Sequence, residues 1–142
     1  MEGTEMKFED YASDKLAQGT ILAAFDQYVE MALWASTDSY GEPLDDTYSY
    51  EHITTGARER MLTDVTEFLA VCWGDVWEDV VIDLSNIEPG QIGGDFWLTR
   101  NGHGAGFWDR GLGEVGQQLT ELATSFGSCA LIEVDNWTLC CE

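Results

Sequence analysis

The stretch that decides the fold covers residues 95–110 and reads DFWLTRNGHGAGFWDR. It begins with an aromatic, partly β-branched run and ends with a second aromatic run. Between the two runs lies Asn101-Gly102, a dipeptide that favours the tight turn of a β-hairpin. The pattern therefore predicts a hairpin in which Trp97 and Trp108 face each other across the two strands.

A second hairpin is expected at the C-terminal end of the chain. Residues 129–134 and 137–141 have strand-like patterns and are joined by an Asp-Asn turn. Between the two hairpins, the pattern predicts a helix from Leu112 or Gly113 to Phe126 that Gly127 ends. The expected fold class is α+β, with helices packed on one face of a small antiparallel sheet built from two hairpins.

The N-terminal half predicts mainly helices. Asp14 can cap a helix that extends to about Ala35, and Thr55 can cap a second helix that extends to about Cys72. The tyrosines, acids and turn residues of 36–50 indicate a long polar loop between them. Helices are therefore expected to supply most of the first half of the core.

Two shorter stretches are less regular. Residues 1–13 are expected to be loosely ordered, and residues 75–84 fit neither the helical nor the strand period cleanly, with a helix favoured. The chain has 142 residues, a length typical of one domain. Residues 1–142 are therefore predicted to form a single domain.

The first expected helix carries two kinds of residue at helical spacing. Leu22, Phe25 and Val29 form an apolar stripe, whereas Asp26 and Glu30 lie four residues apart on another face. We expect the apolar stripe to face the core and the acidic stripe to face solvent.

The chain is strongly acidic, with 27 acidic and 6 basic residues and a formal net charge of −21. The nets of residues 1–50, 51–100 and 101–142 are −9, −7 and −5, so no acidic tail accounts for the total. A hydrophobic content of 44% indicates a folded core and not a disordered acidic segment. A folded surface of this charge repels polyanions, which excludes nucleic acid and anionic membranes as direct ligands and disfavours a homodimer.

The four cysteines, Cys72, Cys129, Cys140 and Cys141, give no metal-binding spacing because the chain contains no Cys-x2-Cys pair. The chain shows no signal peptide and no apolar run long enough to span a bilayer. Free thiols and a cytoplasmic location are therefore expected, with no metal and no cofactor.

The string at 95–110 closely resembles a signature of small proteins encoded by tailed bacteriophages, a family largely of unknown function. The resemblance is specific over these sixteen residues and loose through the following helix and final hairpin. It implies a phage or prophage source and expression in a bacterial cytoplasm, and it implies no reaction.

Three interpretations of this segment stay open. In the first it is structural, with Arg100 or Arg110 paired with Asp95 or Asp109. In the second the exposed imidazole of His103 acts as a general base, which would make the protein a small enzyme. In the third the segment is a recognition hairpin that anchors a partner. The residues of that recognition hairpin would be Trp97, Arg100, His103, Phe107, Trp108 and Arg110.

The leading functional hypothesis is a nucleic-acid mimic without catalysis. Carboxylates on folded elements can match the charge density of duplex DNA and occupy the basic groove of a host nuclease or of a restriction or CRISPR effector. The alternatives are an adaptor that binds through the recognition hairpin and an enzyme centred on His103. The candidate partner-binding acids are Asp26, Glu30, Asp38, Glu42, Asp45, Asp46, Asp64, Glu67, Asp75, Glu78 and Asp79.

Overall fold

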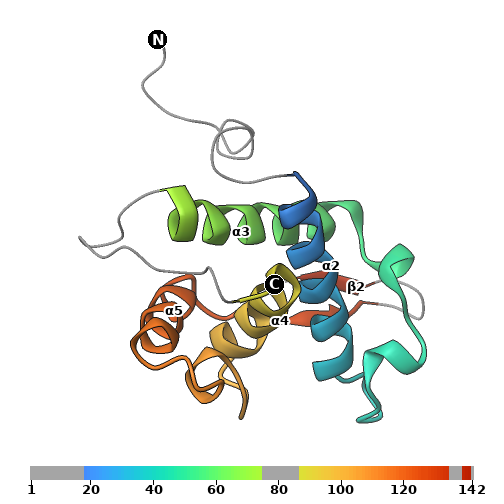
Figure 1. Cartoon of the computed structure of the whole chain (residues 1–142). Coiled ribbons are helices and arrows are strands. Elements are labelled where there is room, and N and C mark those ends of the chain that lie inside the picture. The colour runs from blue at the N-terminus through green and yellow to red at the C-terminus, as the bar shows by residue number, and fades with distance from the viewer. Residues whose placement is uncertain (1–17, 75–86, 135–138, 142) are drawn as a thin grey trace.

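The computed structural model describes residues 18–74, 87–134 and 139–141, so the expected lead-in at 1–13, the cap at Asp14 and the element at 75–84 lie outside the described residues. Helices dominate what is described (Figure 1). The α-helices are α2 (Gln18–Ala35), α3 (Thr55–Gly74), α4 (Pro89–Arg100) and α5 (Glu114–Ser125). Short 3-10 turns lie at η1 (Leu44–Asp46), η2 (Tyr50–His52) and η3 (Phe107–Asp109), and the strands are β1 (Leu131–Glu133) and β2 (Leu139–Cys141).

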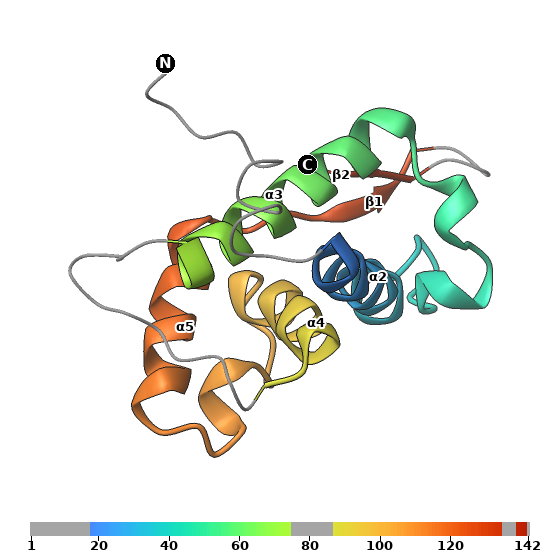
Figure 2. The same cartoon turned by 45° about the horizontal axis from the view of Figure 1, so that its top comes forward.

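Helices α2 and α4 form the tightest contact of the fold. In Figure 2 they lie side by side below α3, and the strand pair lies next to α3. A Cβ atom added to Gly93 of α4 would lie 1.8 Å from the carbonyl oxygen of Ala24. Only a residue without a side chain allows the two backbones to approach this closely.

An aromatic cluster joins the helices in the core. The rings of Phe68 in α3 and Phe96 in α4 stack with centroids 4.1 Å apart and an interplanar angle of 11°. Phe107 continues the stack, and the buried ring of Tyr28 packs on Phe96 from α2. Burial of such large rings supplies much of the hydrophobic stabilisation of a domain of this size.

The hairpin expected at 95–110 is wrong, because its first strand is the second half of helix α4. Pro89 stands in the first turn, where its fixed φ and missing N–H suit a helix. Every residue from Ile92 to Arg100 is buried. The segment therefore lacks the alternation of apolar and polar residues that would distinguish a strand from a helix. The β propensity of these side chains does not decide the structure here, because the segment is buried among other elements. Tertiary packing outweighs intrinsic propensity in such buried segments.

Trp97 and Trp108 consequently do not face each other across a hairpin. Trp97 is 2% exposed inside the core, whereas Trp108 follows a glycine-containing loop and is 54% exposed. Gly102 in that loop has a φ of 70°, which completes the turn after α4.

The α+β fold class is also wrong. The described strands form one antiparallel pair of three residues each, in which Leu131 faces Cys141 and Glu133 faces Leu139. A pair of this size does not form a sheet layer on which helices could pack. The described part of the chain is instead a helical assembly with a small strand pair beside α3.

The structure confirms three of the expected helical segments. Helix α2 ends at Ala35, α3 begins at Thr55, and α5 lies within 113–126. The 36–50 segment contains the 3-10 turn η1 and a bridge between Thr37 and Pro43, so it is more regular than a polar loop.

The cysteines depart from the expected free thiols. Cys129 is disulfide-bonded, whereas Cys72 is a buried free thiol whose pKa is raised by burial. Disulfides are rare in cytosolic proteins, so the cytoplasmic location stays a prediction.

Candidate binding groove

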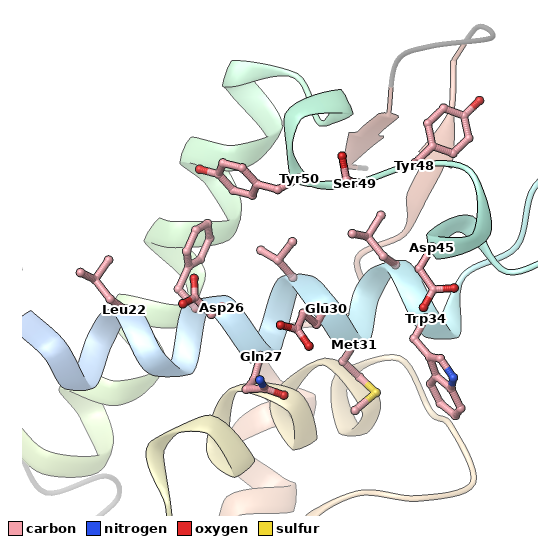
Figure 3. Close-up of a pocket in the computed structure, with 13 residues that line it drawn as sticks. Leu22, Asp26, Gln27, Glu30, Met31, Trp34, Asp45, Tyr48, Ser49 and Tyr50 are labelled. Carbon is pink, nitrogen blue, oxygen red and sulfur yellow. The ribbon is translucent and has the colours of Figure 1, made fainter.

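A groove of about 800 Å³ lies between α2 and the segment that contains η1 and the start of η2 (Figure 3). Helix α2 forms its long side, and Tyr48, Ser49 and Tyr50 lie along the opposite side. We call it the α2 groove. It is lined by Leu22, Phe25, Asp26, Gln27, Val29, Glu30, Met31, Leu33, Trp34, Asp45, Tyr48, Ser49 and Tyr50.

The floor of the α2 groove is apolar and its edges expose large side chains. Phe25, Val29 and Leu33 are each no more than 6% exposed. Leu22 at one end of the helix is 51% exposed and Trp34 at the other end is 61% exposed. Exposed apolar side chains arranged together around a concave floor are typical of a binding surface.

Three carboxylates lie on the same groove. Asp26 and Glu30 project from α2 one helical turn apart, and Asp45 comes from η1 (Figure 3). All three are exposed, and none takes part in the ion pairs formed within the described residues. The groove therefore combines an apolar floor with negative charge that no arginine of the described chain neutralises.

The wall opposite α2 is held by specific contacts. The hydroxyl of Tyr48 donates a hydrogen bond to Glu133 of β1. The ring of Tyr50 packs edge-on against Phe25, with centroids 6.1 Å apart, and the guanidinium of Arg58 lies 4.9 Å from the centre of the same ring. These contacts fix the width of the α2 groove.

The remaining acids of this region have different roles. The carboxylate of Asp38 accepts hydrogen bonds from the backbone N–H groups of Tyr40 and Glu42, at 2.8 and 3.0 Å, and so closes a turn. Glu42 and Asp46 are exposed on the segment that borders the groove. They add negative charge without lining the cavity.

Two candidate acids on α3 lie elsewhere. Asp64 forms an ion pair with Arg100 at 2.8 Å, and its side chain is 17% exposed. Glu67 is half-buried, and its pKa is raised by burial and, to a lesser extent, by Asp64. The structure does not bring these two to the α2 groove, and Asp75, Glu78 and Asp79 lie outside the described residues.

The recognition hairpin is not assembled as a surface. Trp97, Arg100 and Phe107 are 2%, 6% and 0% exposed, so these three cannot serve as contact residues without unfolding. The indole Nε1 of Trp97 has no hydrogen-bond acceptor among the described residues. Only His103, Trp108 and Arg110 of the six are exposed.

Arg100 is the centre of a buried polar network. Its Nη1 donates to Asp64 at 2.8 Å and to the Tyr28 hydroxyl at 3.0 Å. Its Nε donates to the Gly127 carbonyl at 2.7 Å, and its Nη2 donates to the Phe126 carbonyl at 3.2 Å. Burial raises the pKa of Tyr28 to about 12, although the nearby Arg100 opposes the shift.

Of the expected arginine–aspartate pairs in 95–110, the bidentate one is between Arg110 and Asp95. Arg110 Nη2 and Nε donate to the two Asp95 oxygens at 2.8 and 3.1 Å, and this hydrogen bonding raises the pKa of Arg110. Asp95 is 2% exposed, and the bidentate ion pair compensates its buried charge. The arginine–aspartate pair of the structural interpretation is therefore present, whereas the hairpin of that interpretation is not.

His103 lies on the exposed turn after α4, where its backbone N–H donates to the Leu98 carbonyl at 3.0 Å. No side-chain hydrogen bond links it to Asp95 or Asp109, whose carboxylates contact Arg110. Within the described residues, nothing orients this imidazole as a general base would require.

A serine–histidine contact that sequence reasoning missed lies at η2. Ser49 Oγ is 3.4 Å from His52 Nδ1, but the hydroxyl hydrogen-bonds to Glu51 at 2.5 Å and the Ser49 backbone N–H donates to the same imidazole nitrogen at 3.0 Å. The Ser49 hydroxyl lowers the pKa of Glu51. These bonds are those of a local turn cap, and the order Ser-x-x-His was its sequence signal.

Among the described residues no cluster of three or more histidine, cysteine, aspartate or glutamate side chains could hold a metal ion. Nor is any helix within 18–74 and 87–134 long and apolar enough to cross a bilayer. Comparisons with protein-family models, with curated proteins and with solved structures find no match to this chain.

Proposed function

We propose that this protein is an acidic binding protein that imitates nucleic acid and occupies the basic surface of a nucleic-acid-binding protein. The observation that carries the proposal is the exposed carboxylate set of Asp26, Glu30 and Asp45 on the α2 groove, which no described arginine neutralises. Glu42 and Asp46 extend this charge along the bordering segment.

The spacing of these charges supports mimicry. Consecutive turns of α2 place Asp26 and Glu30 about 6 Å apart along the helix axis. Phosphates of one DNA strand repeat about every 3.4 Å along the duplex axis, so the two carboxylates have about the axial spacing of alternate phosphates. A net charge of −21 adds long-range attraction to such a cleft.

The resemblance of residues 95–110 to tailed-phage proteins suggests the class of target. A phage protein that imitates nucleic acid would act on a host nuclease, as an anti-restriction or anti-CRISPR inhibitor in the bacterial cytoplasm. The adaptor alternative loses its anchor because Trp97, Arg100 and Phe107 are buried. We therefore keep a single functional proposal.

The test is capture of partners from a bacterial lysate at low salt by the immobilised protein. We expect nucleic-acid-binding proteins to be retained, to elute as salt rises, and to be displaced by competing duplex DNA. The variant Asp26→Asn/Glu30→Gln/Asp45→Asn should lose them.

The matched control carries Glu88→Gln/Glu114→Gln/Glu121→Gln, three exposed acids that do not line the α2 groove, and should retain them. Partners that bind both triple variants equally well would refute the proposal. So would a lysate from which the protein retains no nucleic-acid-binding protein.

A further inference from the structure

We infer that the α2 groove binds a basic amphipathic α-helix of the partner, with the apolar side of that helix on the groove floor and its lysines or arginines against Asp26, Glu30 and Asp45. This inference rests on the proposed function and specifies the part of the partner that is recognised. A nucleic-acid mimic without such a groove would contact basic side chains alone.

The apolar content of the groove exceeds what imitation of phosphates requires. Phe25, Val29 and Leu33 follow one another at helical spacing along the floor. Leu22 extends this row at its N-terminal end, with Phe25 at i+3 and Val29 at i+7 from it. Trp34 lies about 120° around the helix axis from Leu22, next to Asp26 and Glu30 on the other edge of the groove. A duplex or a flat basic surface would leave the exposed side chains of Leu22 and Trp34 in contact with water or with charge.

The dimensions of the groove fit a helix. From Leu22 to Trp34 the floor extends about 18 Å at a rise of about 1.5 Å per residue, which matches three to four turns of a partner helix. Helices pack at axis separations of about 8–10 Å, and the wall at Tyr48 and Tyr50 stands beside α2 as a second support. The partner helix would lie along α2 between these two supports.

Charge complementarity identifies the other face of the occupant. Asp26 and Glu30 lie on one edge of the floor, and Asp45 lies near its Trp34 end (Figure 3). Among the described arginines, Arg100 and Arg110 are paired with Asp64 and Asp95, Arg58 lies over the Tyr50 ring, and Arg60 forms no ion pair with the groove acids. The charges of the groove must therefore be matched by an occupant that brings its own cations.

A fluorescence-polarisation experiment with the full chain tests the inference. The probe is a fluorescein-labelled peptide of about 14 residues, long enough for the floor at about 1.5 Å per residue. It carries leucines at i, i+3, i+4 and i+7, and lysines elsewhere. A second peptide has the same composition with the leucines placed without helical periodicity.

We expect the amphipathic peptide to bind about tenfold more tightly than the scrambled one, because only the former presents one apolar face. Trp34→Ala and Leu22→Ala should each weaken binding about tenfold, in the range typical of aromatic and aliphatic anchors. Trp108→Ala and Leu62→Ala are the matched controls, since both side chains are exposed outside the groove, at 54% and 38%. These two variants should bind the peptide as the wild type does.

Equal binding of the two peptides, or unchanged binding by Trp34→Ala and Leu22→Ala, would overturn the inference. A dimer that Trp34→Ala dissociates in analytical ultracentrifugation would also overturn it, because a second copy would then cover the groove. If Trp34→Ala keeps the lysate partners that the Asp26/Glu30/Asp45 variant loses, the groove inference fails while the nucleic-acid mimic stands. If both variants keep those partners, the proposed function itself fails.

Discussion

The two sides of helix α2 differ in almost every physical respect. The side that contains Ala24 and Tyr28 packs against α4 so closely that Gly93 has no room for a methyl group, and the Tyr28 hydroxyl accepts a hydrogen bond from Arg100. The opposite side exposes Leu22, Asp26, Glu30 and Trp34 around an open groove. On the packed side the charge of Arg100 is compensated within the fold, whereas the carboxylates of the open side form no ion pair within the described residues.

This difference separates stability from binding along a single helix. Substitutions on the packed side should change the free energy of unfolding, because they remove buried hydrogen bonds or force backbones apart. Substitutions on the open side should change affinity with little effect on unfolding.

The largest effect is expected from Arg100→Met. The change leaves the Asp64 carboxylate without its ion pair and the Tyr28 hydroxyl and two backbone carbonyls without a donor. Loss of one partner of a buried pair costs about 3–5 kcal/mol, which urea unfolding measures directly. Arg60→Met is the matched control, because it removes the same charge from an exposed position. Its free energy of unfolding should stay within about 0.5 kcal/mol of the wild-type value.

A pH titration of stability gives the next effect. The folded-state pKa of Tyr28 is raised from 10.0 to about 12, so the unfolded chain loses this proton first as pH rises. The contribution of the neutral phenol is fully present below pH 10 and disappears between about pH 10 and 12, by up to about 3 kcal/mol. Tyr28→Phe should remove this part of the alkaline loss of stability, and an unchanged slope would contradict the assignment.

Gly93→Ala should destabilise by about 1–3 kcal/mol through overpacking, since its Cβ would lie 1.8 Å from the Ala24 carbonyl oxygen. Gly94→Ala is the matched control because its Cβ would lie 3.4 Å from Met31 Cε and 3.9 Å from the Gln27 carbonyl oxygen, which are ordinary van der Waals contacts. Helix propensity alone favours alanine by about 1 kcal/mol at both sites. Thermal unfolding of the two variants should therefore shift in opposite directions.

The smallest change in stability is expected on the open side. Asp26→Asn/Glu30→Gln removes two exposed charges one turn apart, and their mutual repulsion is worth only a few tenths of a kcal/mol. Unfolding should therefore stay within about 0.5 kcal/mol of wild type while partner binding is lost. A loss of more than about 1.5 kcal/mol would show that these acids support the fold and would erase the contrast between the two sides.

Sequence patterns predicted those helices whose ends carry capping residues and whose faces carry apolar residues at helical spacing. The Gly127 stop after 113–126 follows from capping rules, whereas the cap of α3 is Thr54, whose hydroxyl oxygen accepts the Ala57 backbone N–H at 3.2 Å, and not the expected Thr55. The strand expected within 95–100 failed because α4 is enclosed on all sides, which erases the periodicity that distinguishes strand from helix. The close contact of Gly93 with α2 is a tertiary fact that no local pattern reports.

The candidate site was predicted only in part. Asp26 and Glu30 were identified by their spacing, but Leu22 was assigned to the core and is exposed on the groove. The commitment of Asp64 to Arg100, 36 residues away, was invisible because local sequence does not encode which distant charges meet. The opposite wall at Tyr48 was missed for the same reason.

The buried members of 95–110 change what its resemblance to phage proteins can mean. The resemblance stays a prediction, but Trp97, Arg100 and Phe107 stabilise the interior of this chain. Another chain with the same string would be expected to share this internal scaffold. Partner choice would then depend on the groove, whose residues lie elsewhere in the sequence.

Tyr48 connects that groove to the far end of the chain. Tyr48 is one of the residues that line the cavity, and its side chain points away from α2 (Figure 3), where its hydroxyl donates to Glu133 on the strand that pairs with Leu139–Cys141. An occupant that moves this side chain would have to break this bond and the edge-on contact of the ring with His52. If an occupant moves Tyr48, occupancy of the cavity and pairing of β1 with β2 are thermodynamically linked, and each alters the other by the same coupling free energy.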